Sequence, residues 1–153
     1  MRRLACLGSV AIALAVAAGA LRDTQAQPTD ITTAKIGIVN HTGNFIYSAS
    51  VNDAGGANMS AWGVGGADVC CISLPRAWYS GMKVSVRWNM PVGVKSVIKE
   101  KIVEVEKYER PGSVYMHFFP DDEVRVIVSG VGPRSPDYPI PHSGNPNVTS
   151  SSN

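Results

Sequence analysis

Three histidines and two adjacent cysteines are the side chains of this sequence that could do chemistry. His41 is in a turn-forming segment, His117 is in a segment of alternating apolar and polar residues, and His142 follows several prolines. No two histidines have the spacing of a metal site, and no Cys-x-x-Cys motif occurs. Cys71 with a histidine could be imagined as a nucleophile and its base, but no motif supports that hypothesis. We therefore predict a protein that is not an enzyme and has no cofactor or metal.

The two cysteines, Cys70 and Cys71, form a pair whose redox state the sequence leaves open. Neighbouring Cα atoms lie about 3.8 Å apart, below the usual disulfide range of about 4.4–6.8 Å. A strand also points consecutive side chains to opposite faces. Buried free thiols, a strained bridge and an intermolecular bridge all remain open. We favour buried thiols because unpaired cysteine is often buried, whereas a strained bridge would be easily reduced and could act as a redox switch.

A glycine-rich segment from Asp53 to Ala67 predicts a long surface loop. This segment carries Trp62, and tryptophan is enriched in the residues that dominate binding interfaces. The alternative is that Trp62 folds back over the end of the domain. The full set predicted to bind a partner is Asn58, Met59, Trp62, Trp78, Tyr79 and Tyr138.

Period-two alternation of apolar and polar residues predicts the strands that position these side chains. We predict an all-β domain over residues 35–140, an Ig-like β-sandwich of about seven short antiparallel strands. In the segment 97–107 the apolar phase slips between Ile102 and Val103, which predicts a bulge or a bend, although a charged helix is the alternative there. The predicted strands cover residues 35–40, 45–52, 69–74, 82–90, 97–107, 114–119 and 124–129.

The first 26 residues are typical of a removable export signal. Two arginines precede an uncharged apolar run over residues 4–21, and Thr24 and Ala26 fit the cleavage-site positions. A transmembrane anchor is the alternative, although about 18 residues is the lower limit for spanning a bilayer. Cleavage after Ala26 would leave residues 27–34 as a linker and release a periplasmic protein.

Loss of this leader would change the charge of the protein. The chain has 14 basic and 12 acidic side chains, and the leader holds three of the basic and one of the acidic groups, so eleven of each remain. A neutral domain lacks the basic face that nucleic acid requires. Cys6 lies at the start of the apolar run rather than at its end, so we predict no lipid anchor. Residues 141–153 are predicted to be a disordered tail.

Several motifs together resemble a known family. They are Val69-Cys70-Cys71-Ile72-Ser73-Leu74-Pro75, Val114-Tyr115-Met116-His117-Phe118, and Gly132-Pro133 followed by Pro136-Asp137-Tyr138-Pro139. They resemble domain-of-unknown-function family 3304, a family of small exported bacterial proteins, and the resemblance covers nearly all of residues 36–140.

The resemblance implies an envelope protein, usually a lipoprotein, often found near antibacterial phospholipase effectors of the type VI secretion system. The implied role is an immunity or accessory protein that binds such an effector in the periplasm. This chain departs from the pattern because it lacks the lipid-attachment cysteine, which favours a soluble periplasmic form. The alternative is a structural or stress-related envelope protein with no effector partner. The family implies no catalytic residues.

Overall fold

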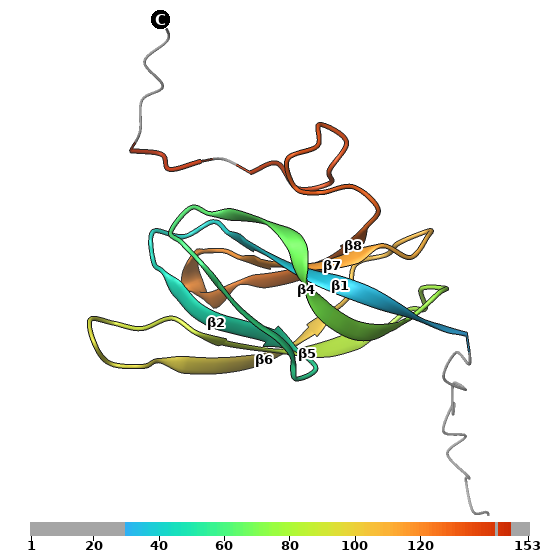
Figure 1. Cartoon of the computed structure of the whole chain (residues 1–153), viewed down its shortest axis with the longest axis horizontal. Helices are drawn as coiled ribbons and strands as arrows, with labels where there is room; N and C mark the ends of the chain where they lie inside the picture. Colours follow the sequence, from blue (N-terminus) through green and yellow to red (C-terminus); the bar gives the residue numbers. More distant parts are fainter. Residues whose placement is uncertain (1–29, 143, 148–153) are drawn as a thin grey trace, which may run out of the picture.

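The structure is a computed structural model that describes residues 30–142 and 144–147 (Figure 1). The predicted export signal over residues 1–26 lies outside the described residues. Eight strands make up the described part of the chain. They are β1 (Ile31–Asn40), β2 (Ile46–Val51), β3 (Ala54–Met59), β4 (Val64–Pro75), β5 (Lys83–Asn89), β6 (Ile98–Glu104), β7 (Ser113–Phe118) and β8 (Val124–Ser129).

Two four-stranded sheets pack together and confirm the predicted β-sandwich (Figure 1). One sheet has the order β4-β1-β7-β8 and the other has the order β3-β2-β5-β6. The strand pairs are antiparallel except for β1 and β7, which run parallel with Ile36 opposite Val114. The prediction of antiparallel strands alone is therefore wrong at this pair. A parallel pair requires a long crossover rather than a hairpin, and strands β2 to β6 supply it.

The core lies between the two sheets and is built from alternate residues of the strands. In β5, Val84, Val86 and Trp88 are buried, as the period-two pattern predicts. In β7, Met116 and Phe118 point into the same core. Burying a side chain of this size contributes roughly 1.5–3 kcal/mol, so these alternating positions are a main source of stability.

The predicted glycine-rich loop is wrong over most of its length. β3 forms within it and β4 begins at Val64, so only residues 60–63 connect the two strands. Gly55 and Gly56 adopt positive φ angles of 118° and 106°, which other residues rarely tolerate. A Cβ on Gly55 would come within 3.0 Å of the Ala49 carbonyl oxygen, so glycine permits the close pairing of β3 with β2.

Strand β6 also differs from its prediction. It pairs with β5 in an unbroken register from Lys83–Glu104 to Asn89–Ile98, so the predicted bulge at Ile102 is wrong. Ile98 and Ile102 are exposed while Val103 is buried. The apolar phase slips because isoleucines occupy the solvent-facing side of a regular strand.

The segment from Val131 to His142, which we call the C-terminal strap, covers the outer face of the β4-β1-β7-β8 sheet. A second apolar cluster forms there, made of Tyr115, Ile127, Tyr138 and Ile140. As a result β7 is buried on both faces. At the other end of the domain β1 begins at Ile31, inside the segment expected to be a linker. Residues 141–142 and 144–147 of the expected tail contain no helix or strand, and its other residues lie outside the described part.

Candidate functional site

The residues predicted to bind a partner do not form one surface. Trp62 lies just before the start of β4 at Val64, whereas Trp78 and Tyr79 follow its end at Pro75. Because β4 has twelve residues and spans the sandwich, the two groups lie at opposite ends.

Trp78 and Tyr79 have structural contacts. The Trp78 Nε1 donates a hydrogen bond to the Val105 carbonyl oxygen at 2.9 Å, and both aromatic rings pack against the core. Met59 also packs against the core, while Asn58 beside it is exposed. Of these four residues, Asn58 is the one whose side chain is free of the core.

Trp62 is half-buried and lies beside Gly43, where a Cβ would be 3.6 Å from its indole nitrogen. The ring borders a surface hollow of about 270 Å³ that also touches Met90, Lys99 and Phe119. The Trp62 side chain therefore packs on its neighbours, as one prediction expects, and its ring still faces a surface hollow, as the other expects.

Tyr138 is buried by the fold and belongs to a polar chain that sequence spacing does not indicate. Its hydroxyl lies 2.7 Å from the His117 Nε2, and the His117 Nδ1 lies 2.9 Å from the His41 Nε2. His117 is fully buried and His41 is 5% exposed. We call His41, His117 and Tyr138 the histidine–tyrosine chain.

Aromatic and charged neighbours surround this chain. Phe119 stacks on the His41 ring with centroids 4.2 Å apart, and the His142 ring lies 5.2 Å from His41. Burial is the main cause that lowers the pKa of His41 to about 4 and of His117 to about 3, with nearby His142 and Arg125 adding to it. Burial also raises the pKa of Tyr138. All three groups are therefore neutral near pH 7.

The parallel pairing of β1 with β7 brings the two histidines together. Val39 is in register with His117, and the His41 backbone nitrogen donates to the Phe118 carbonyl oxygen at 2.8 Å. A sequence separation of 76 residues gives no signal for such a contact. The described residues contain no group of three histidine, cysteine, aspartate or glutamate side chains arranged to hold a metal ion. In this geometry the histidine–tyrosine chain ties the C-terminal strap to β7.

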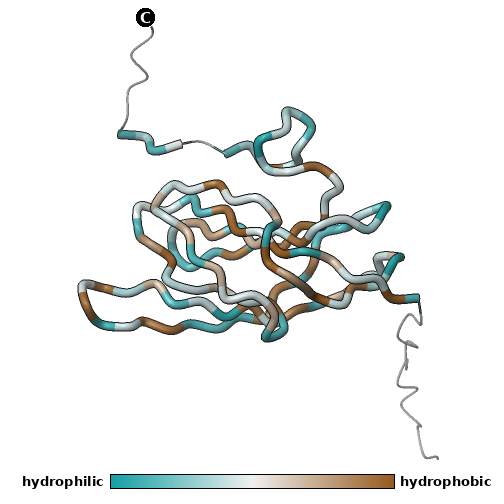
Figure 2. Tube along the Cα trace, viewed as in Figure 1, coloured by the Kyte–Doolittle hydropathy of each residue, from teal (hydrophilic) through white to brown (hydrophobic). Residues whose placement is uncertain are grey.

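Exposed apolar side chains gather at one end of the β3-β2-β5-β6 sheet, in a set that sequence reasoning missed. The loop between β5 and β6 projects from the sandwich with an apolar tip (Figure 2). Val92 is 73% exposed there and Val94 is fully exposed. The set also contains Phe45 and Tyr47, which flank the first residue of β2, and Ile98, the first residue of β6.

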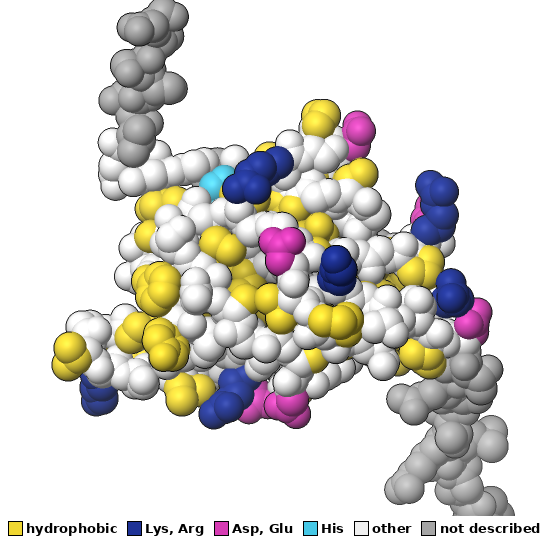
Figure 3. Space-filling view, viewed as in Figure 1, with side chains coloured by type: hydrophobic (Ala, Val, Ile, Leu, Met, Phe, Trp, Pro, Cys, Tyr) yellow, Lys and Arg dark blue, Asp and Glu magenta, His cyan; other side chains and the backbone are white. Residues whose placement is uncertain are grey.

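Strand register places the segments that carry these residues at the same end of the sheet. Ser48 of β2 is opposite Asn89 at the end of β5, and Asn89 is opposite Ile98. Figure 3 shows apolar side chains on the side where the β5–β6 loop projects. We call this set, Phe45, Tyr47, Val92, Val94 and Ile98, the end patch. The run Met90-Pro91-Val92-Gly93-Val94 could have indicated it, since a turn rarely needs so many apolar residues.

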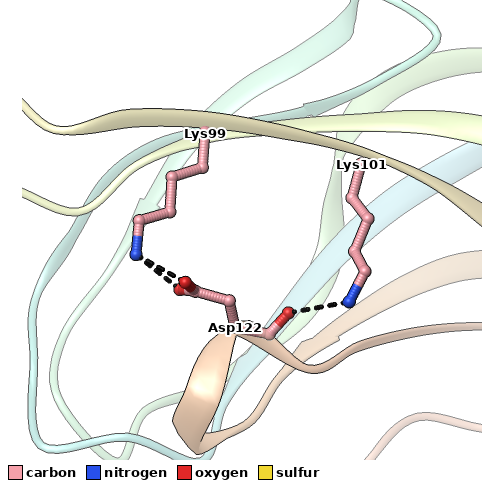
Figure 4. A network of polar contacts seen from close by, with 3 residues as sticks. All are labelled: Lys99, Lys101 and Asp122. Atoms are coloured by element: carbon pink, nitrogen blue, oxygen red, sulfur yellow. Dashed lines mark hydrogen bonds and ion pairs between the residues drawn. The ribbon is translucent and has the colours of Figure 1, made fainter.

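A charged network borders the end patch and closes the edge of the sandwich (Figure 4). The Lys99 Nζ lies 2.6 Å from one Asp122 carboxylate oxygen and 2.7 Å from the other, and the Lys101 Nζ donates to the Asp122 carbonyl oxygen at 3.3 Å. Both lysines belong to edge strand β6, and Asp122 precedes β8 in the other sheet. Pro120–Asp122 forms a 3₁₀ turn, and this turn anchors the network.

Cys70 and Cys71 are not buried free thiols, so the prediction that favoured this state is wrong. Cys70 is bonded to Cys71 in a disulfide on the outermost strand β4. Cys70 is exposed and Cys71 is half-buried. Ala34 faces Ile72 and Ile36 faces Val69, so two residues of β4 are opposite the single Lys35 of β1. This bulge removes the regular alternation that would have sent the two side chains to opposite faces.

The comparison with protein families gives one match. The family described as protein of unknown function (DUF3304) matches residues 39–126. The chain belongs to this family. The DUF3304 match includes His41, the cysteine pair, His117 and the end patch, whereas Tyr138 of the strap lies beyond it.

No curated protein and no solved structure matches this DUF3304 chain. Within the described residues, no helix is long and apolar enough to cross a membrane.

Proposed function

We propose that this chain is an exported protein-binding module of the bacterial envelope. Its proposed role is that of an immunity or accessory protein that binds and neutralises a phospholipase-type effector of the type VI secretion system. The observation that carries the binding role is the end patch. The effector is the partner that the resemblance to the DUF3304 family implies, and the leader-like first 26 residues support delivery to the periplasm.

The composition of the end patch favours a protein partner. Exposed apolar side chains scattered singly are normal, but a contiguous group rimmed by polar residues marks an interaction site. Tyr47 supplies a large aromatic ring with a polar tip, a type enriched in binding hot spots. Lys95 in the same loop supplies a rim charge, which would guide approach to an acidic partner surface.

The scaffold beneath the patch is firmly held, which suits a blocking role. Phe45 and Tyr47 flank Ile46, which is fully buried, and Ile98 is paired through Asn89 with the central strand β5. A partner would therefore meet an ordered surface at Phe45, Tyr47 and Ile98, so little conformational entropy is lost at these three residues on binding. The hollow beside Trp62 shares Met90 with the base of the projecting loop and extends the surface a partner could use.

The test is co-purification with the product of a neighbouring phospholipase-like gene, followed by a lipase assay. We expect a nanomolar complex that abolishes the lipase activity. Tyr47→Asp and Val94→Asp should each weaken it at least tenfold, because each places a charge in the apolar contact. Val131→Asp is the matched control, since Val131 is 39% exposed but lies on the C-terminal strap.

Two results would overturn parts of this proposal. If no candidate effector binds at micromolar concentration, the immunity role fails and a structural or stress-related envelope role takes its place. If the complex forms but the two patch variants bind as tightly as Val131→Asp, the end patch is not the interface.

A further inference from the structure

We propose that Cys70 and Cys71 form a reversible redox site that exchanges two electrons with a dithiol while the domain stays folded. This inference is independent of the effector-binding role. It rests on the position of the pair in β4, on its exposure, and on the contacts that hold the strand on either side.

An attacking thiolate can reach the bridge from solvent. β4 is the outermost strand of its sheet, so one side of it has no hydrogen-bonded neighbour strand. Cys70 is exposed, and exposed disulfides are the labile ones. Since thiol–disulfide exchange requires access to a sulfur atom, Cys70 is the expected point of attack.

The strand on both sides of the bridge is held without it. On one side Val69 pairs with Ile36, and on the other Ile72 pairs with Ala34. Ala34, Ile36 and Ile72 are all buried in the main core. Opening the bridge therefore releases two residues of a bulge and leaves the flanking pairs in place.

The bridge closes a very short loop, which also makes its loss tolerable. A disulfide stabilises a fold mainly by restricting the unfolded chain, and this restriction grows with the number of residues enclosed. Adjacent cysteines enclose none. The pair therefore adds little to the stability of the domain, which is unusual for a structural disulfide and suits an exchange site.

The exchange balances as a two-electron transfer. A thiolate of the dithiol attacks the Cys70 sulfur, the bond between Cys70 and Cys71 breaks, and Cys71 leaves as a thiolate. The second thiol of the dithiol then attacks the mixed disulfide and releases Cys70. Two protons end on the cysteine thiolates, the dithiol is oxidised to a disulfide, and the protein bridge is reduced.

The test uses dithiothreitol as the dithiol, at neutral pH and without denaturant. The protein is alkylated with iodoacetamide after treatment, and the peptide containing residues 70–71 is weighed by mass spectrometry. We expect no alkylation before reduction, two alkyl groups after it, and an unchanged circular dichroism spectrum. Removal of the reductant in air should restore the unmodified peptide.

Two single variants test the direction of attack. Cys71→Ser retains the exposed Cys70, and Cys70→Ser retains the half-buried Cys71. The first should react with an aromatic disulfide reagent roughly tenfold faster, because exchange rates follow access to the sulfur. The proposal is overturned if the peptide is alkylated before reduction, if reduction requires denaturant, if the fold is lost with the bridge, or if the two variants react equally fast.

Discussion

Buried imidazoles in the histidine–tyrosine chain make the stability of the domain depend on pH. In the unfolded chain both histidines take up protons below about pH 6.5. In the folded state the pKa of His41 is about 4 and that of His117 about 3. At pH values between the folded-state and the unfolded-state pKa, the unfolded chain binds more protons than the folded domain. The stability present at neutral pH is therefore lost as the pH falls. Protonation of the pair would also place two cations beside each other and near Arg125.

The first prediction follows from this linkage. From pH 7 to pH 5 the free energy of unfolding should fall on the order of 2 kcal/mol per histidine. Urea titrations at a series of pH values measure it. His117→Asn should be less stable at pH 7 but show a flatter dependence between pH 7 and 5. A wild-type stability that does not change over this range would contradict the burial of neutral imidazoles.

The second prediction concerns the hydroxyl that ends the chain. Tyr138→Phe removes the partner of the His117 Nε2 at 2.7 Å and leaves a buried nitrogen without a hydrogen bond. The expected loss of stability is about 1–3 kcal/mol. Tyr47→Phe is the matched control, because the Tyr47 ring is 63% exposed, and it should change stability by less than about 0.5 kcal/mol. Equal midpoints for the two variants in thermal unfolding would show that the strap is not held by this contact.

At the scale of elements, the edge strand β6 carries charged side chains of a kind that protects a sheet edge from pairing with another chain. An unpaired strand edge is a template for another chain, and charged side chains that point inward are one natural protection. Lys99 and Lys101 provide this protection on β6 through Asp122. After the end of β6, Val105 forms a parallel β-bridge with Val126 of edge strand β8. This bridge covers part of the β8 edge.

The third prediction is that replacing both lysines opens the β6 edge. The double variant Lys99→Val and Lys101→Val should associate into dimers or larger species at micromolar concentration, as measured by light scattering after size-exclusion chromatography. The same replacements at Lys35 and Lys83, which are exposed on interior strands β1 and β5, leave the edge protected and should not increase association. If both double variants elute alike, the ion pair has no protective role.

Much of the strand content is predictable from the sequence because burial on one face imposes period-two alternation. β5 follows that rule, and β7 and β8 also form where they are predicted, although the C-terminal strap buries their outer face as well. β3 does not, because four of its six residues are glycine or alanine and its pairing with β2 overrides their low strand propensity. The parallel contact of β1 with β7 depends on where the chain returns after five other strands, which local patterning does not encode.

The same limit applies to the candidate site. Trp62 is predicted as a contact residue from its type and the glycines around it, and its role in binding stays a prediction. The end patch was missed because its members come from two separate segments, 45–47 and 92–98, and join only through the register of β2, β5 and β6. Tyr138 was read as a surface contact because nothing in its local sequence indicates His117 as its partner.

At the scale of the whole molecule, the sandwich places its distinct features in separate regions. The end patch occupies one end of the β3-β2-β5-β6 sheet, the strap covers the outer face of the other sheet, and the cysteine bridge lies on that sheet's outer strand β4. The proposed binding surface can therefore be changed without disturbing the histidine–tyrosine chain or the bridge. This separation lets each prediction be tested by its own variants.

The central claim is that this domain binds a partner protein through the end patch. Hydrogen–deuterium exchange of the chain, alone and with a candidate phospholipase-type effector, tests it most directly. We predict slower exchange in the complex over residues 44–48 and 90–98, with no change over residues 76–81 at the opposite end. Identical exchange with and without the partner, or protection confined to residues 76–81, would contradict the claim.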